Sequence, residues 1–476
     1  MKRVLFKQKG ARFSLFDCRS EPEKSVGHFD ARHLTKSFYL TALLDSLFLS
    51  FAIPVTTEPD QESRWRVVHV LASVIAMLAF VWAVWASGHV ALSRLLVKYG
   101  TTVADAAVLD AAIALTPTDA ETHYARAEVS NFVGQPAEAL KEIELAVSLR
   151  PRDYILWLEL GMTRDQLGDT AGALSAFNES VRLAPYYSQP RWQRGNLLFR
   201  VGRYEEAFVD LRNAATSNPD LVPTFVDLAW GASRHDAAVT EQLFQPRTDS
   251  AHLALARFLA THGRPADAVT QFKLAHDTSD QMRGELIGQL VGSGGFKQAY
   301  ELWSSGPGSA AGSKTIYDGG FEAALRVDEV GFGWRTSHEP GVSLSVDANQ
   351  SQSGARSLRV DFSGNSNPGA QIVSQLILTE PTTRYKLSFA ARTQKIVTGG
   401  LPIIVVSEAT GDRRQLGRSL SLPQETSGWQ QFAFEFDTGP ACEAILISLQ
   451  RENCTSSPCP IFGSLNLDSF SLDRVK

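Results

Sequence analysis

The 476-residue sequence contains little charge and little cysteine. Charged residues make up 20% of the chain and hydrophobic residues 44%, so the composition fits neither a disordered chain nor a strongly basic nucleic-acid binder. Four cysteines in a chain of this length exclude a disulfide-dense scaffold. Three of them, Cys442, Cys454 and Cys459, lie in the last 35 residues, which favours an oxidising compartment for that end.

The sequence also lacks the short motifs of several enzyme classes. It has no phosphate-binding GxxxxGK[ST] loop, no HExxH zinc motif and no GxSxG nucleophile motif. Basic patches with interleaved aromatic residues are missing after the N-terminal arm, which argues against a nucleic-acid partner. A pair of carboxylates for glycoside hydrolysis leaves no local signature, so the sequence alone does not exclude it. We predict that the protein is not an enzyme.

A long uncharged stretch follows a basic N-terminal arm. Residues 1–66 contain 11 Lys and Arg against 8 Asp and Glu, and residues 67–93 contain none of these four types. About 20 apolar residues in a helix cross the hydrocarbon core of a bilayer. Aromatic residues at both ends of the stretch, such as Trp65 and Trp85, suit the headgroup level. We therefore predict a transmembrane helix at 67–93, with a buried helix of the following domain as the alternative.

The side of the membrane depends on a second apolar segment. Residues 38–55 are mostly apolar but include the charged Asp45 near their middle, which disfavours insertion and suggests an interfacial or loosely packed helix. With one span, the basic arm favours a cytoplasmic N-terminus and an extracytoplasmic C-terminal body, as in a single-pass protein of the bacterial inner membrane. With two spans, the C-terminal body would return to the cytoplasm.

Proline and glycine recur with a period of 34 in the next 200 residues. Amphipathic stretches of helical period separate them, so proline ends each second helix and glycine each first helix of a helix-turn-helix unit. The prolines are Pro117, Pro151, Pro185 and Pro219, and the glycines are Gly134, Gly168 and Gly202.

These units resemble the tetratricopeptide repeat, and residues 101–303 are predicted to form an all-α solenoid of this kind. In the best-matched unit the signature positions are occupied by Trp157, Leu160, Gly161, Gly168, Ala173, Phe177 and Pro185. The resemblance implies a groove that binds a protein partner. We expect signature aromatic residues such as Phe177 and Tyr204 to pack between helices rather than to contact that partner.

The composition changes after the solenoid. Residues 304–313 are a small-residue linker, and 314–476 contain short alternating segments bounded by turn residues, which predicts an all-β sandwich. The pattern resembles the jelly-roll carbohydrate-binding modules of families four and nine, for example in GFGW at 331–334 and GWQQFAFEF at 428–436. This resemblance implies saccharide binding by stacking aromatics and planar polar groups. The candidates are Trp334 as a platform, with Gln375 and Arg392 as polar contacts because their strand phase points away from the expected core.

The same resemblance implies one structural calcium ion between the first and last strands. Glu322 and Asp468 stand where its ligands would come from, with a plain surface pair as the alternative. Cys454 and Cys459 have a spacing that permits a small disulfide ring, while two metal ligands or two free thiols are the alternatives.

These features together suggest a multidomain, non-enzymatic, membrane-anchored adaptor. Its solenoid would bind a protein partner and its sandwich a polysaccharide or a second protein. Bacterial proteins that combine such repeats with such a sandwich resemble accessory components of exopolysaccharide or envelope assembly. The alternative is a purely structural assembly factor whose sandwich has no sugar site.

Overall fold

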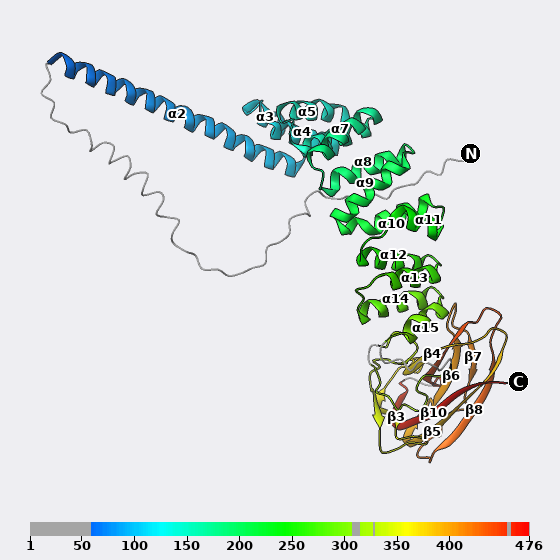
Figure 1. Ribbon diagram of the computed structural model, residues 1–476. Coiled ribbons are helices and arrows are strands. Elements are labelled where there is room, and N and C mark those ends of the chain that lie inside the picture. The colour runs from blue at the N-terminus through cyan, green and yellow to red at the C-terminus, as the bar shows by residue number, and fades with distance from the viewer. Residues whose placement is uncertain (1–58, 307–314, 327–328, 455–457, 476) are drawn as a thin grey trace. The chain divides into compact units, whose positions relative to one another are not determined.

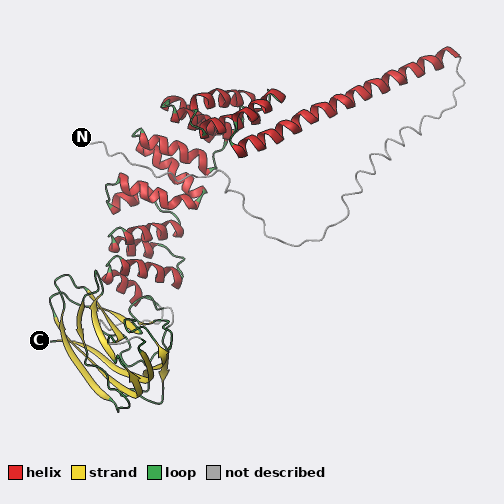
Figure 2. Cartoon of the chain, turned by 180° about the vertical axis from the view of Figure 1, so that it is seen from behind, coloured by secondary structure: helices red, strands yellow, loops and turns green. Residues whose placement is uncertain are grey.

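The computed structural model describes residues 59–306, 315–326, 329–454 and 458–475. It contains an apolar N-terminal helix, a series of paired helices and a region of two antiparallel sheets. The helices precede the strands along the chain (Figure 2). This arrangement confirms the fold class predicted from the sequence.

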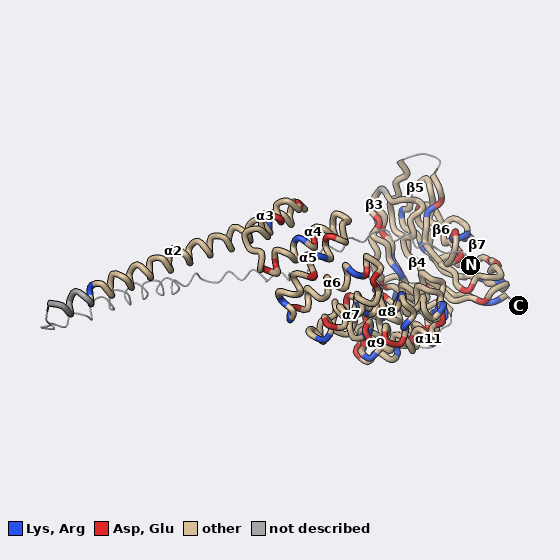
Figure 3. The backbone as a smooth tube through the Cα atoms, turned by 90° about the horizontal axis from the view of Figure 1, so that it is seen from above, with Lys and Arg blue, Asp and Glu red and all other residues tan. Residues whose placement is uncertain are grey.

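Helix α2 (Pro59–Val103) contains the uncharged stretch and continues past its predicted end at residue 93. Among the described residues it is the one helix that is long and apolar enough, by length and composition, to cross a membrane. Charged residues are sparse along it (Figure 3). The segment at 38–55 predicted as a second apolar helix lies outside the described residues.

From Ala91 onward, α2 packs against the first helices of the solenoid. The Ser93 hydroxyl donates to the carbonyl of Ala112 on α3 (Ala106–Leu115) at 3.1 Å. Arg94 forms an ion pair with Asp119 at 2.9 Å. Helix α3 precedes the first complete helix pair along the chain.

The following helices form consecutive antiparallel pairs, coloured from cyan to green in Figure 1. The 3-10 helix η2 (Pro219–Leu221) precedes the fourth pair. The pairs are α4 (Ala120–Phe132) with α5 (Pro136–Leu149), α6 (Tyr154–Gln166) with α7 (Thr170–Leu183), α8 (Ser188–Arg200) with α9 (Tyr204–Ser217), α10 (Val222–Ala232) with α11 (Ala237–Phe244), α12 (Asp249–Thr261) with α13 (Pro265–Leu274), and α14 (Asp280–Gly292) with α15 (Phe296–Ser304).

Local chemistry explains where these helices begin, end and meet. The Asp153 carboxylate caps α6 by accepting the Ile155 amide at 3.0 Å. Gly168 follows α6 with φ at 80°, a left-handed conformation that glycine adopts without strain. A Cβ at Gly161 would lie 2.5 Å from the Phe177 ring, so only glycine lets α6 and α7 approach this closely.

The C-terminal region is a sandwich of two five-stranded antiparallel sheets. Their strand orders are β1-β4-β9-β6-β7 and β2-β3-β10-β5-β8, and we call them sheet A and sheet B. The strands are β1 (Trp334–Thr336), β2 (Val342–Asp347), β3 (Ser357–Asn365), β4 (Val373–Leu378), β5 (Arg384–Thr398), β6 (Pro402–Glu408), β7 (Gln415–Arg418), β8 (Gln430–Asp437), β9 (Ala444–Arg451) and β10 (Pro460–Arg474).

The two faces of sheet A pack against different neighbours. Val373 and Ile377 of β4 point into the sandwich core, together with Leu358 and Phe389 of sheet B. Leu376, on the opposite face of β4, belongs to the hydrophobic cluster of the last solenoid helices. Sheet B keeps its outer face polar, so it alternates between apolar and polar residues as a half-exposed sheet does.

Candidate partner-binding and saccharide-binding surfaces

A row of exposed apolar side chains follows the turns inside the first three helix pairs. We call it the turn row, and its side chains are between 42% and 73% exposed. Equivalent positions of stacked repeats recur along one edge of a solenoid, so the members of the row lie along the same edge. Its members are Phe132, Val133, Leu167, Val201 and Tyr204. Tyr204 packs against Phe199 of α8, with ring centroids 5.3 Å apart, as predicted, but 53% of the residue stays exposed.

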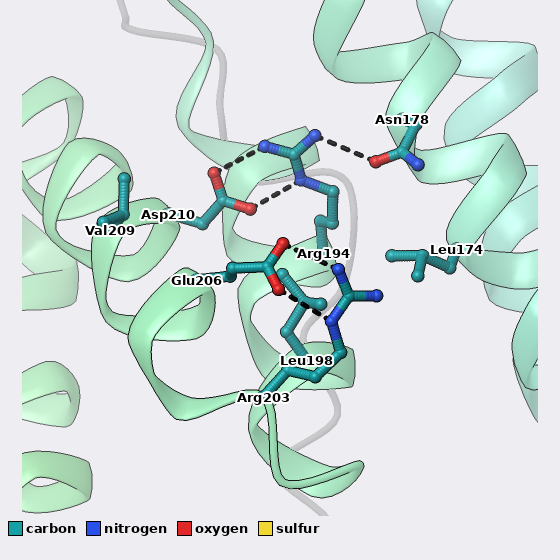
Figure 4. Close-up of a pocket in the computed structure, with 8 residues that line it drawn as sticks. All are labelled: Leu174, Asn178, Arg194, Leu198, Arg203, Glu206, Val209 and Asp210. Carbon is teal, nitrogen blue, oxygen red and sulfur yellow. Dashed lines mark hydrogen bonds and ion pairs between the residues drawn. The ribbon is translucent and has the colours of Figure 1, made fainter.

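A cavity of about 330 Å³ opens between α7, α8 and α9 (Figure 4). Arg194 lies at its centre, where Nε and Nη2 donate to the Asp210 carboxylate at 2.6 and 2.7 Å and Nη1 donates to Asn178 at 3.0 Å. Arg203 and Glu206 form a second two-bonded pair at its rim. Asp210 also pairs with Arg191 at 3.3 Å, so two arginines share this carboxylate, and Leu174, Leu198 and Val209 form the apolar part of the cavity wall.

A group of acidic side chains lies between α4 and α6. Tyr124 donates to Glu128 at 2.8 Å, and Asn131 donates to Glu159 at 2.8 Å. Burial raises the pKa of Glu159, and the charge of Glu128 raises it further against the lowering effect of the Asn131 hydrogen bond. Burial likewise raises the pKa of Glu128. Neither carboxylate forms an ion pair within the part of the chain that the structure describes.

In the sandwich, Trp334 is a core residue. Its side chain is 5% exposed and packs against Phe321 and Phe470, with ring centroids 4.8 and 5.1 Å away. The indole Nε1 donates to the Asp318 carbonyl at 3.0 Å. The ring therefore has no open face on which a sugar could stack in this conformation.

Gln375 also lies inside the sandwich, against the strand phase inferred from the sequence. Its side chain is fully buried, donates to the Tyr317 carbonyl at 2.8 Å and accepts the Tyr317 amide at 3.2 Å. Both faces of β4 pack against other parts of the protein, so nearly all of its residues are buried. The strand therefore lacks the alternation of buried and exposed residues that would have indicated which side chains point inward.

Arg392 lies on the polar outer face of sheet B, as expected. It contacts Gln350 and is paired across the strands with Asn466 of β10. Phe462, two pairs further along the same face of β10, is 48% exposed. Sequence reasoning missed Phe462, although its even spacing from Ser464 and Asn466 places it on the outward face of the strand.

Glu322 and Asp468, the expected calcium ligands, hold one loop from two sides. Asp468 is buried and accepts the amides of Gln352 and Ser353 at 2.6 and 3.0 Å. Glu322 accepts the amide of Ala355 at 2.9 Å. Their oxygens are of the type that calcium prefers, but much of their accepting capacity serves the backbone. Among the described residues no group of three or more His, Cys, Asp and Glu could hold a metal ion.

The structure joins Cys454 and Cys459 by a disulfide, with Cα atoms 6.1 Å apart. Cys442 is a buried free thiol whose pKa is raised by burial. Cys18 lies outside the described residues. Of the candidate side chains in the sandwich, Arg392 therefore remains open to a ligand, while Trp334 and Gln375 do not.

Comparisons with known proteins support the repeats. Residues 132–188 match the family model described as tetratricopeptide repeat. A 101-residue stretch is 31% identical to Protein FlbA of Caulobacter vibrioides, covering 21% of this chain and 17% of that protein. A 122-residue stretch is 27% identical to BBSome complex member bbs-4 of Caenorhabditis elegans, covering 25% of this chain and 26% of the relative. The chain thus matches at most about a quarter of the length of these relatives.

Several solved structures are similar to parts of this chain. The match to the structure of MamA covers 36% of this chain and 84% of the MamA chain, with 15% identity and a TM-score of 0.25. The match to the structure of Pseudomonas aeruginosa pilF covers 46% of this chain and 97% of the pilF chain, with 16% identity and a TM-score of 0.30. The match to a structure described as CBM4 covers 34% of this chain and 99% of that structure's chain, with 13% identity and a TM-score of 0.25. The family match thus places a tetratricopeptide-repeat sequence within residues 132–188 of the helical region.

Proposed function

We propose that this protein is a non-enzymatic adaptor, anchored to a membrane by α2, whose solenoid binds a protein partner along the turn row. The exposed apolar side chains of that row carry the proposal. Phe132 and Tyr204 leave aromatic surface in water at the two ends of the row, and aromatic residues are enriched where proteins bind one another. The neighbouring cavity around Arg194 would receive a side chain of the same partner.

Site-specific photocrosslinking in the full chain tests this proposal. A photoreactive residue at Phe132, Leu167 or Tyr204 should capture the same partner, because all three positions lie on one edge. The matched control is Leu145 on α5, which is exposed but lies outside the row. The replacements Phe132→Asp and Tyr204→Asp should abolish capture at Leu167 without changing the melting temperature. Equal capture at Leu145 would contradict the proposal.

The sandwich is proposed to bind a saccharide on the outer face of sheet B. Phe462 would stack on a sugar ring, while Arg392 on the same outer face would bond its hydroxyls. Bacterial exopolysaccharide is the proposed ligand class, with the body of the protein outside the cytoplasm. The buried positions of Trp334 and Gln375 favour the alternative of a structural assembly factor without a sugar site.

Calorimetric titration of the full chain with envelope polysaccharide fragments distinguishes these two functions. Binding that weakens at least tenfold in Phe462→Ala and Arg392→Ala, but not in Leu420→Ala, supports the saccharide adaptor. Leu420 is the control because it is even more exposed than Phe462 and lies outside β10. Absence of any heat of binding would favour the structural role.

A further inference from the structure

Arg451, the last residue of β9, carries a guanidinium group that is almost entirely buried. The residue is 3% exposed. Its Nε donates to the carbonyl of Gly400 at 3.2 Å, and Nη1 donates to the carbonyl of Ser366 at 2.9 Å. Its Nη2 lies 2.8 Å from the Thr398 hydroxyl and 3.0 Å from the carbonyl of Cys459. Neutral groups therefore satisfy all sides of the guanidinium.

Within the described part of the chain, no acid balances the charge of this guanidinium. Among the described residues, no carboxylate forms an ion pair with Arg451, and the adjacent Glu452 pairs with Arg418 instead. Burial lowers the pKa of Arg451, yet a guanidinium stays protonated in proteins. A buried cation without a counter-ion favours a negative charge beside it.

The two sulfurs of the disulfide are the groups best placed to supply that charge. Nη2 of Arg451 lies 3.0 Å from Sγ of Cys459 and 3.9 Å from Sγ of Cys454. A thiolate at Cys459 would accept a charge-assisted hydrogen bond from the guanidinium, and a thiolate at Cys454 would receive a weaker one. Arg451 would thus stabilise a thiolate at Cys459 more than a thiolate at Cys454.

We propose that the Cys454–Cys459 disulfide is an exchange site for external dithiols, in which Arg451 stabilises Cys459 as the leaving thiolate. One thiolate of the dithiol attacks Sγ of Cys454, where a new sulfur–sulfur bond forms, and the bond to Cys459 breaks. The electron pair of the broken bond stays on Cys459 beside Arg451.

The second step completes the transfer of two electrons to the protein. The other thiolate of the dithiol attacks its partner sulfur in the mixed disulfide, so the dithiol leaves oxidised as an intramolecular disulfide. Cys454 departs as a thiolate and takes a proton from water. The protein then holds a thiol at Cys454 and a thiolate at Cys459.

The first test is the pH dependence of alkylation in the full-length chain in detergent. In Cys454→Ser, the rate of iodoacetamide labelling of Cys459 is measured by mass spectrometry of the peptide that contains it. Its midpoint should lie at least about one pH unit below the value near 8.5 of an ordinary thiol. Cys459→Ser, with labelling of Cys454, is the matched control and should titrate higher.

Two further measurements make the test decisive. The low midpoint of Cys459 should return to about 8.5 in guanidinium chloride, because unfolding removes Arg451. In glutathione redox buffers, Arg451→Gln should make the disulfide about tenfold harder to reduce than in the wild type. A Cys459 midpoint at or above that of Cys454 in the folded chain would overturn the proposal, as would unchanged reduction in a folded Arg451→Gln variant. If that variant does not fold, the Cys454→Ser titration decides alone.

Discussion

At the scale of single residues, Glu159 makes the solenoid sensitive to pH. Burial raises the pKa of its carboxyl, so the folded chain holds that proton more tightly than the unfolded chain does. The stability contributed by the protonated form is present at low pH and is lost as the pH rises through the raised value. We expect the helical region to melt at a lower temperature at pH 8 than at pH 5.

Glu159→Gln should reduce this pH dependence and raise the melting temperature at pH 8, while the raised pKa of Glu128 accounts for the remainder. The glutamine oxygen can still accept the hydrogen bond from Asn131, so the change removes charge and little else. Circular dichroism at 222 nm across pH 5–8 measures the effect. Glu205→Gln on α9, where the side chain is exposed, is the control and should leave the pH dependence as it is. A parallel loss in both variants would contradict the prediction.

Phe177→Ala should destabilise the solenoid by about 3–5 kcal/mol, because the buried ring fills the space that Gly161 leaves between α6 and α7. Guanidinium titration followed at 222 nm gives the change in unfolding free energy. Phe132→Ala, at an exposed phenylalanine, should stay within about 0.5 kcal/mol of the wild type. Similar costs for the two variants would show that the ring of Phe177 is not packed as described.

The residues of the candidate sites were predictable to different degrees. Phe177 was recognisable because its position in the repeat determines its packing. The orientation of Gln375 was not recognisable, because β4 is buried on both faces and its polar residues, Ser374 and Gln375, do not alternate with apolar ones. The burial of Trp334 depends on Phe321 and Phe470, which lie far from each other in sequence and meet only in the folded sandwich.

At the scale of elements, each helix pair contacts mainly the neighbouring pairs. We therefore expect that a whole pair can be deleted without disrupting the packing of the others. Deleting residues 154–187 removes α6, α7 and the turn that follows, and places Asp153 directly before Ser188, where it can cap α8 as it now caps α6. We expect this variant to unfold cooperatively with reduced helicity.

Deleting residues 154–170 is the matched control for this experiment. It removes α6 and Thr170, the first residue of α7. The rest of α7 is left without its partner, which exposes the apolar face around Phe177. Calorimetry should show a broad or missing helical transition for this variant. If both deletions unfold equally sharply, the pairs are not the cooperative units.

Helices were easier to predict than strands for a physical reason. Proline and glycine mark the ends of the helices through backbone geometry, which is local in sequence. Strand pairing is not local. For example, β10 pairs with β3 and β5, whose residues are more than 60 positions away in the sequence. The sequence therefore indicated a sandwich but not which face of it stays open.

At the scale of the whole molecule, the side of the membrane decides which ligands are within reach. A single span through α2 and a basic N-terminal arm predict an extracytoplasmic C-terminus. Alkaline phosphatase fused after Lys476 should then be active, and a green fluorescent protein at the same place should be dark. The opposite result would mean that the segment at 38–55 also spans the membrane and that the sandwich has no access to envelope polysaccharide.

The glycines that end the first helices have a consequence for how the chain tolerates mutation. Gly134, Gly168, Gly202, Gly263 and Gly294 have φ between 72° and 83°, where any other residue is strained. The fourth pair instead turns through Arg234 and His235, at 56° and 69°. A saturation mutagenesis scan should therefore show sharp intolerance at the five glycines and wide tolerance, with stabilising glycine substitutions, at the turn between α10 and α11.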